Sequence, residues 1–213
     1  MRFFDVITIF PNVLDSYFNE SILKRAQKKR LIKFKTWDLR DFAKDKHRTV
    51  DDKPYGGGVG MILKVDIIFK AVKKAIKRNK KTRIILLSAK GKTFDQKHAK
   101  RLNKYDQLIL ICGHYEGVDE RVAKHIADEE ISIGDYVLTG GEVPAMVICD
   151  SVARLIPGVI NEESLKEESN VNFKEYPQYT RPEIFNDWKV PKILLSGHHK
   201  KIQEWKKIKS VAK

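Results

Sequence analysis

The chain has 213 residues, of which 42% are hydrophobic and 33% charged, so it can form the packed core of one large domain, with or without a small appendage. This composition excludes a membrane protein, since no run of 18 apolar residues occurs. The first residues also lack the long apolar stretch of a signal peptide. We therefore expect a cytoplasmic protein without a membrane partner. The formal net charge of +14 favours a polyanionic partner such as nucleic acid, although a general drift towards lysine would also raise it.

Apolar segments that indicate strands alternate with helical patterns over the first 155 residues. The strand candidates are residues 3–9, 31–37, 84–87, 108–112 and 131–137, and the helix candidates are residues 13–28, 65–79, 94–103, 120–125 and 144–155. Thr93 and Gln96 have the spacing of a capping box at the start of the third helix. Continuous apolar runs such as residues 108–111 are typical of strands buried on both faces. The sequence therefore predicts an α/β fold, a mostly parallel sheet with helices on both faces.

The composition changes after Pro157 and Gly158, where a polar and irregular stretch begins. Such a change indicates a linker rather than another packed element. We therefore expect three parts: a domain over residues 1–158, a flexible interdomain linker over residues 159–181, and a small basic helical domain over residues 182–213.

Two stretches of the chain are densely basic. Residues 189–213 contain eight lysines and one glutamate, and residues 73–81 form a second cluster of cations. In the first stretch Ile202, Trp205 and Ile208 recur at helical spacing, which predicts a helix with one apolar stripe and one basic face. The lysines of this helix expected to contact RNA phosphates are Lys200, Lys201, Lys206 and Lys207.

Residues 54–61 contain four of the twelve glycines. This loop fits neither a dinucleotide-binding motif nor a P-loop. Glycines let a backbone approach a ligand closely, so we interpret Gly56, Gly57 and Gly58 as substrate or phosphate contacts; a flexible surface turn is the simpler alternative.

Polar or glycine-containing loops follow several of the predicted strands. They cover residues 88–91, 113–117, 132–136 and 139–142. Ligands of parallel sheets gather at the carboxyl ends of the strands, so these loops predict a small-molecule pocket there. The pattern does not name the ligand.

Cys112 and Cys149 lie inside apolar runs and lack a CxxC spacing. We interpret both as buried free thiols in a reducing compartment. Two scattered cysteines and the six histidines do not form a zinc-binding pattern, so the sequence predicts no metal ligand.

Four segments in this order resemble the signature of the bacterial tRNA (guanine-N1)-methyltransferases of the SPOUT class: residues 47–58, 113–121, 132–142 and 179–183. The resemblance runs from Arg2 to about Lys209 without large gaps. It implies a cofactor domain tied in a deep trefoil knot, which pattern reasoning would not predict because chains rarely thread loops. It also implies the activity, transfer of a methyl group from S-adenosylmethionine to N1 of guanine 37 in tRNA, next to the anticodon.

By this resemblance, the S-adenosylmethionine pocket is built from three loops that follow strands. The residues implied are Leu86, Leu87, Ser88, Ala89, Gly113, Tyr115, Glu116, Ser132, Ile133, Gly134, Asp135, Tyr136, Val137, Leu138, Gly140 and Gly141. Such a pocket suits the cofactor, because adenine needs an apolar slot with backbone hydrogen-bonding groups. Core packing would equally explain the apolar character of Ile133 and Leu138.

The resemblance also assigns removal of the N1 proton to a carboxylate in the linker, helped by an arginine. The arginine corresponds to Arg154, and the carboxylate, four residues before the Tyr-Thr-Arg-Pro-Glu motif, corresponds to Glu175. Many members of the family have aspartate there, so this chain has the same functional group with one more methylene. A solvated linker glutamate is the simpler interpretation of Glu175.

The resemblance further implies a homodimer in which the linker of one subunit completes the cofactor pocket of the other. We expect tRNA as the partner and no DNA partner, and the sequence does not indicate whether Mg²⁺ takes part. Two alternatives stay open. A non-catalytic RNA-binding protein would need no linker carboxylate, and a SPOUT enzyme for rRNA or another tRNA base would position its substrate differently from the Glu175–Arg154 pair.

Overall fold

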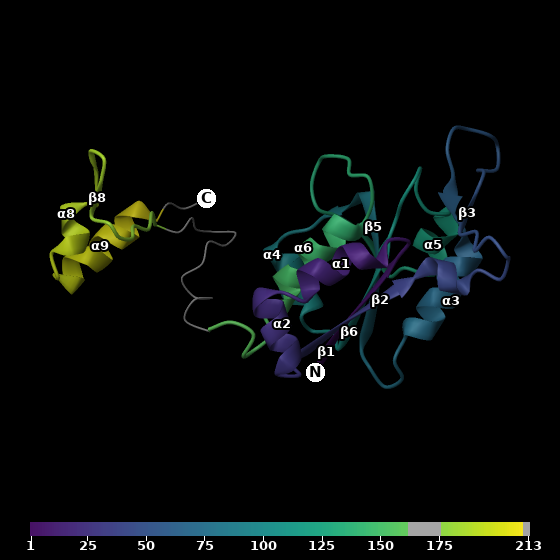
Figure 1. The fold of residues 1–213 in the computed structure, drawn as a ribbon, viewed down its shortest axis with the longest axis horizontal. Coiled ribbons are helices and arrows are strands. Elements are labelled where there is room, and N and C mark those ends of the chain that lie inside the picture. Colours follow the sequence, from purple (N-terminus) through teal and green to yellow (C-terminus); the bar gives the residue numbers. More distant parts are fainter. Residues whose placement is uncertain (162–175, 211–213) are drawn as a thin grey trace. The chain divides into compact units, whose positions relative to one another are not determined.

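The computed structural model describes residues 1–161 and 176–210. The chain divides into two compact units, Met1–Ile160 and Asn161–Lys213; helices pack around a sheet in the first, and the second contains short helices (Figure 1). Most of the predicted linker, residues 162–175, lies outside the described residues. The three-part organisation expected from the sequence therefore stays a prediction.

A five-stranded sheet forms the centre of the Met1–Ile160 unit. Its strands are β1 (Arg2–Thr8), β2 (Ile32–Asp38), β5 (Thr82–Thr93), β6 (Gln107–Cys112) and β7 (Glu129–Ser132). They lie in the order β2-β1-β6-β5-β7, and every neighbouring pair is parallel. The central strand β6 is buried along its whole length, as expected for a strand covered on both faces. The predicted α/β fold is confirmed, while the trefoil knot stays a prediction.

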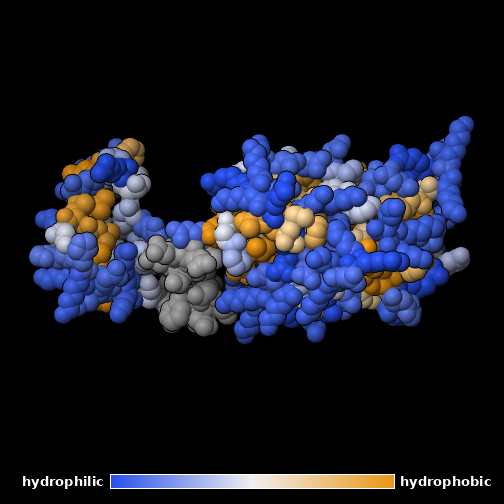
Figure 2. All heavy atoms as spheres, turned by 90° about the horizontal axis from the view of Figure 1, so that it is seen from below, coloured by the Kyte–Doolittle hydropathy of each residue, from blue (hydrophilic) through white to orange (hydrophobic). Residues whose placement is uncertain are grey.

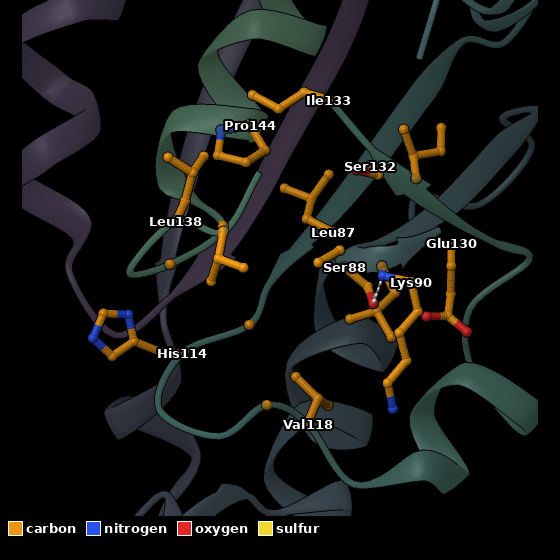
Figure 3. A pocket seen from close by; sticks show the side chains of 18 of the residues that line it. Leu87, Ser88, Lys90, His114, Val118, Glu130, Ser132, Ile133, Leu138 and Pro144 are labelled. Carbon is orange, nitrogen blue, oxygen red and sulfur yellow. Dashed lines mark hydrogen bonds between the residues drawn. The ribbon is translucent and has the colours of Figure 1, made fainter. Parts of the chain in front are cut away.

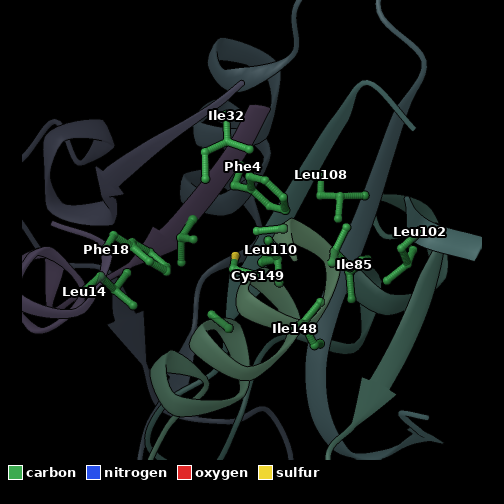
Figure 4. Packing of buried hydrophobic residues seen from close by; sticks show 14 of the residues in the cluster. Phe4, Leu14, Phe18, Ile32, Ile85, Leu102, Leu108, Leu110, Ile148 and Cys149 are labelled. Atoms are coloured by element: carbon green, nitrogen blue, oxygen red, sulfur yellow. The ribbon is translucent and has the colours of Figure 1, made fainter. Parts of the chain in front are cut away.

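Helices cover both faces of this sheet, and each face has its own apolar core. The first face is covered by α1 (Pro11–Phe18), α2 (Ser21–Lys28), α4 (Gln96–Leu102) and α6 (Glu142–Ala153). The second face is covered by the 3-10 helix η1 (Leu39–Phe42), α3 (Val65–Ala75) and α5 (Glu120–His125). Figure 4 shows the first core, where Phe4 and Leu110 of the sheet lie with Ile148 of α6. Cys112 and Cys149 are free and buried there, as predicted, and burial raises the pKa of both thiols.

The strand predicted over residues 131–137 is wrong after its first two residues, because β7 ends at Ser132. The hydroxyl of Ser132 accepts the N–H of Gly134 at 3.2 Å, and the chain leaves the sheet in a loop. The capping box is also wrong, because Thr93 is the last residue of β5. Asp95 caps α4 instead, and its carboxylate accepts a backbone N–H of the first turn at 2.8 Å.

Two predicted helices differ in extent. The helix expected over residues 13–28 is divided into α1 and α2, because Ser21 has a φ of 49°, and a left-handed residue cannot continue a right-handed helix. The helix expected over residues 65–79 ends at Ala75, because Ile76, with a ψ of 126°, leaves the helical conformation.

The Asn161–Lys213 unit contains the hairpin of β8 (Ile184–Phe185) and β9 (Trp188–Lys189), followed by α8 (Lys192–Leu195) and α9 (His199–Lys209). The helix α9 is the basic helix predicted from the sequence, and its Trp205 ring lies 6.5 Å from that of Tyr179. Its apolar stripe is shorter than predicted, because Ile208 is 77% exposed. Among the described helices of both units, none has the length and apolar character to cross a membrane.

An ion-pair network joins the edge strand β7 to the rest of the first unit. Glu129 at the start of β7 accepts hydrogen bonds from Arg83 of β5 at 2.7 Å and from Arg101 of α4 at 2.6 Å. Burial opposes ionisation of this carboxyl group, but the hydrogen bonds from Arg101 and Arg83 outweigh burial and lower the pKa of Glu129. Three elements are therefore held together by one carboxylate.

We predict that Glu129→Gln lowers the free energy of unfolding by about 1–3 kcal/mol at neutral pH, because two charge-assisted hydrogen bonds lose their charged acceptor. Since the pKa is depressed in the folded state, the carboxylate stabilises the fold above its unfolded pKa and loses this effect as the pH falls through the folded pKa. The difference between variant and wild type should therefore shrink at about pH 3. Urea unfolding at both pH values measures it.

Glu20→Gln is the matched control, because Glu20 forms an exposed pair with Lys24 at 3.9 Å. Such pairs contribute about 0–1 kcal/mol. Equal losses in the two variants, or a loss in Glu129→Gln that does not change with pH, would show that Glu129 is not the anchor of β7.

Candidate active site

A cavity of about 270 Å³ lies at the carboxyl edge of the sheet, beside β5 and beyond the ends of β6 and β7 (Figure 3). Its walls are residues 86–90 of β5, where the pairing with β7 shifts register, the loops that follow β6 and β7, and the first turns of α5 and α6. The loop predicted over residues 88–91 is therefore wrong, because β5 continues through these residues to Thr93. All five strands are parallel, so these loops meet at one edge, where α/β proteins bind small molecules. The volume is close to the lower end of the roughly 300–1,000 Å³ that is typical of ligand sites.

The structure brings together nearly all the residues that the sequence analysis assigned to the cofactor. Those that line the cavity are Leu86, Leu87, Ser88, Ala89, Gly113, Tyr115, Glu116, Ser132, Ile133, Gly134, Tyr136, Val137, Leu138, Gly140 and Gly141. Asp135 is the exception, because it is exposed and does not belong to the lining, although both of its neighbours do.

Other lining residues were not assigned to the cofactor from the sequence. They are Lys90, His114, Gly117, Val118, Glu120, Ala123, Glu130, Ile131, Thr139 and Pro144. Three of them lie in the loops predicted to form the pocket, so the sequence could have assigned them to it: Lys90, His114 and Thr139. Val118 had no such signal, because it reaches the cavity while pairing with Leu63, which is distant in sequence.

Two walls of the cavity meet where the start of α6 approaches the end of β6. A Cβ on Gly141 would stand 2.6 Å from the Cα of Cys112, so only glycine fits there. The N–H of Gly141 donates to the carbonyl of Gly113 at 2.9 Å. The two loops are therefore held in direct backbone contact.

The third loop of the cavity is held by its own short hydrogen bonds. The Ser132 hydroxyl donates to the carbonyl of Gly134 at 3.0 Å, and the Tyr136 hydroxyl donates to the carbonyl of Ile133 at 3.3 Å. Beyond these bonds Val137 is 88% exposed. Exposed apolar side chains beside a cavity are typical of a surface that binds a ligand or a protein.

A buried carboxylate, Glu142 at the start of α6, lies behind the Gly140 wall. Its Oε1 accepts the hydroxyl of Thr8 at 2.5 Å, and Thr8 Oγ1 accepts the N–H of Phe10 at 2.9 Å. A Cβ on Gly140 would stand 2.4 Å from Glu142 Oε2 and 2.5 Å from His114 Nδ1. Within the described residues, that buried Nδ1 has no hydrogen-bond partner. Glu142 of α6 and His114 of the loop after β6 thus leave no room for a side chain on Gly140.

The glycine-rich loop predicted to contact the substrate connects β3 (Asp51–Asp52) to β4 (Ile62–Leu63). Its three consecutive glycines, which are exposed and have positive φ values, are Gly56, Gly57 and Gly58. They do not line the cavity. The base of the hairpin does reach the cavity loops, because the N–H of Glu116 donates to the carbonyl of Met61 at 3.2 Å.

Of the two predicted catalytic residues, only Arg154 lies within the described structure. Arg154 is exposed at the C-terminal end of α6 and does not belong to the cavity lining. The 12 residues of this helix correspond to about 18 Å along its axis. Glu175 lies outside the described residues. The lysines predicted to bind phosphate are on α9 of the other unit: Lys200, Lys201, Lys206 and Lys207.

Comparison with known proteins gives the same family over the whole chain. Residues 1–213 match the family described as "tRNA (Guanine-1)-methyltransferase TrmD". A tRNA (guanine-N(1)-)-methyltransferase of Dictyoglomus turgidum is 56% identical over 211 residues, which cover 98% of this chain and 85% of the relative. Relatives of the same name are 51% identical in Ruminiclostridium cellulolyticum, covering 95% and 88%, and 49% identical in Clostridioides difficile, covering 98% and 92%. The chain therefore belongs to the tRNA (guanine-N1)-methyltransferase family, as its four motifs predicted.

Proposed function

We propose that this tRNA (guanine-N1)-methyltransferase binds S-adenosylmethionine in the cavity at the carboxyl edge and methylates guanine 37, next to the anticodon. The observation that carries the proposal is the convergence of the irregular middle part of β5 and the loops after β6 and β7 on one cavity. When bound, the cofactor supplies the methyl group. Methylation of tRNA at guanine N1 follows from the family, and the position 37 rests on the sequence resemblance alone.

The residues of the cavity fit such a cofactor. Leu87 and Leu138 provide apolar walls for an adenine ring, and the loop backbones provide hydrogen-bonding groups. Glu116 lines the cavity and is exposed, so its carboxylate is available to an ammonium group of the ligand. The close backbone contact at Gly141 fixes the wall between these elements.

We predict that the isolated protein binds S-adenosylmethionine without tRNA. At a hundredfold excess over Kd, binding adds about 2.7 kcal/mol to the free energy of unfolding and raises the melting temperature. Gly141→Ala should abolish this shift, because the new Cβ would collide with the backbone of Cys112. Gly57→Ala should keep it: a Cβ there meets nothing within 4 Å, and the strain of a side chain at a φ of 82° lowers the melting temperature equally with and without cofactor. Thermal melts of the three proteins with and without cofactor decide the matter, and an unshifted wild type would contradict the cofactor site.

In the proposed reaction, Glu175 takes the N1 proton of guanine and Arg154 stabilises the negative charge that spreads onto O6. Guanine N1 is a poor nucleophile while protonated, so a positioned base increases the rate by roughly 10²–10⁴-fold. A fixed guanidinium acts on developing charge in the same way as other preorganised donors. Glu116 and Asp135 are the competing carboxylates, and the position of Glu116 in the cavity lining favours a role in cofactor binding.

We predict that Glu175→Gln lowers single-turnover methylation by roughly 10²–10⁴-fold with little effect on cofactor binding, because the amide keeps the shape but cannot accept a proton. Glu175→Asp should retain much of the activity, and Arg154→Ala should lose turnover. Glu20→Gln, an exposed glutamate of an isolated ion pair, is the control. If Glu175→Gln methylates within a few-fold of wild type, the assignment is wrong. Asp135→Asn, followed by Gln at each of the other linker glutamates, Glu162, Glu163, Glu167 and Glu168, then identifies the base.

A homodimer is supported by an exposed apolar surface formed by α1 and α6. Val13, Val143 and Val147 on these helices are 48%, 51% and 38% exposed, and contiguous exposed apolar side chains mark interaction surfaces. The two helices are joined by a hydrogen bond from the Tyr17 hydroxyl to Asp150 at 2.5 Å, which raises the pKa of Tyr17 to about 12. A second copy on this surface would lie beside both ends of α6, the cavity at one and Arg154 at the other.

We predict that two differently disabled chains complement each other. One chain carries Gly141→Ala, which removes its cofactor site. The other chain carries Arg154→Ala, which removes its catalytic arginine. A homodimer of either variant should be inactive. Co-expressed heterodimers contain one intact composite site and should recover up to about half of the activity per heterodimer, because one of two sites works. Methylation assays on tagged, co-purified heterodimers measure it. Monomeric behaviour in light scattering at micromolar concentration, or no recovery, would contradict shared sites.

The proposed tRNA contacts outside the cavity are the basic helix α9 and the glycine-rich loop between β3 and β4. Lys200, Lys201 and Lys207 are exposed on α9, and Lys206 lies 4.5 Å from the ring centroid of Tyr176. Flexible lysines of this kind neutralise phosphates without reading sequence. Free thiols and a tRNA substrate also support a cytoplasmic location for the enzyme.

A further inference from the structure

The amino edge of the sheet, opposite to the cavity, carries cations that the proposed mechanism does not use. Residues 73–83 contain seven lysines and arginines and no acidic residue. After α3 ends at Ala75, the turn over residues 76–81 leads into β5. In Figure 1 this turn and the N-terminus lie together at the lower end of the sheet, whereas the cavity loops follow the opposite ends of the strands.

A second turn, over residues 103–106, lies directly beside the first. The N–H of Asp106 donates to the carbonyl of Lys81 at 2.8 Å, and the N–H of Lys81 donates to the carboxylate of Asp106 at 3.0 Å. The Nζ of Lys81 lies 4.9 Å from the ring centroid of Tyr105. The hydrogen bond from Lys81 and the nearby charge of Lys80 lower the pKa of Asp106, so the one acid of this turn is already occupied by the backbone.

The cations at this edge divide into two groups. Lys77 and Arg83 serve the fold, because Lys77 lies 3.4 Å from the buried Asp5 and Arg83 bonds Glu129. The remaining cations of the two turns, which exclude Lys73 and Lys74 on α3, are exposed and, within the described chain, form no ion pair closer than 4 Å. We call them the amino-edge basic surface: Arg78, Lys80, Lys81 and Lys104.

Unpaired like charges on adjacent turns repel one another, and a bound polyanion removes that repulsion. Figure 2 is seen from below relative to Figure 1 and thus faces this edge; hydrophilic side chains prevail there, with smaller apolar patches between them. Several exposed cations on two adjacent turns, one of them beside the Tyr105 ring, match the chemistry of an RNA backbone, whose phosphates bind lysine and arginine. An isolated phosphate group would need fewer cations and a more enclosed site.

We propose that the amino-edge basic surface is a second contact for the tRNA backbone, separate from the cavity. The six residues of β6 correspond to roughly 20 Å between the two edges, so this surface binds phosphates of nucleotides other than the one that is methylated. Phosphate contacts of this kind position an RNA and carry no sequence information. The inference rests on tRNA as the substrate and adds a binding surface to it.

The test compares Lys80→Glu/Lys81→Glu with Lys97→Glu/Lys100→Glu, which changes the net charge equally on exposed residues of α4. Fluorescence anisotropy with an unmodified tRNA transcript, between about 50 and 300 mM KCl, gives Kd and its salt dependence. We expect the amino-edge variant to bind on the order of tenfold more weakly at the lowest salt. The slope of log K against log salt should flatten by roughly 1–2 units, since each lost phosphate contact removes about 0.7–0.9; the control should change much less.

If tRNA binding weakens equally in both variants, net charge alone is responsible and the proposal is overturned. An unchanged salt-dependence slope in the amino-edge variant would also overturn it. Thermal melts and the cofactor-induced shift confirm that the fold and the cavity are intact. If the charge reversal lowers the melting temperature, the same comparison is made with neutral substitutions, and the same criteria apply. The two variants are then Lys80→Gln/Lys81→Gln and Lys97→Gln/Lys100→Gln. A wild-type protein that binds the cofactor but not tRNA would overturn the proposed substrate itself, which is a different result from a failure confined to Lys80 and Lys81.

Discussion

All five strands of the central sheet run in the same direction, and this constraint decides where the functional surfaces can lie. A connection between parallel strands must cross from one edge of the sheet to the other, usually through a helix. Loops such as residues 113–117 therefore all emerge at the carboxyl edge, and turns such as residues 76–81 all emerge at the amino edge. A small-molecule cavity and a polyanion-binding surface can then occupy one small unit without competing for the same residues.

The cavity depends on the contact between the start of α6 and the ends of β1 and β6. A buried carboxylate without hydrogen bonds is strongly unfavourable, but Glu142 has the Thr8 hydroxyl and the N-terminal end of a helix beside it, both of which stabilise negative charge. These contacts exist only while the first turn of α6 stays in place. Gly140 and Gly141, which line the cavity, immediately precede that turn. The shape of the cavity and the stability of this end of the fold consequently rest on the same interactions.

The sheet and the cavity loops after β6 and β7 could be predicted because strand-forming runs and the glycines after them are local features, whereas the loop predicted over residues 88–91 belongs to β5. The error at Thr93 shows what a local pattern cannot predict. Thr93 and Asp95 are both good capping residues, but Thr93 belongs to β5 because it pairs with Ser132 of β7, which is distant in sequence. Val118 was missed for the same reason, since it reaches the cavity through a long-range pairing. Arg154 came from the family resemblance, because an exposed arginine at the end of a helix has no local signature of catalysis.

The helix α6 connects the cavity to the proposed partner surface. Its sequence is apolar on nearly all sides, and such a helix is normally buried all round. In the single chain, Val143 and Val147 remain exposed although Ile148 packs in the core, so one side of α6 lacks a cover. A second copy packed against this side would bury the helix and lie beside both the cavity at its start and Arg154 at its end. The exposed side of α6 thus gives a physical argument for the proposed dimer, in which the base and the cofactor site would come from different chains.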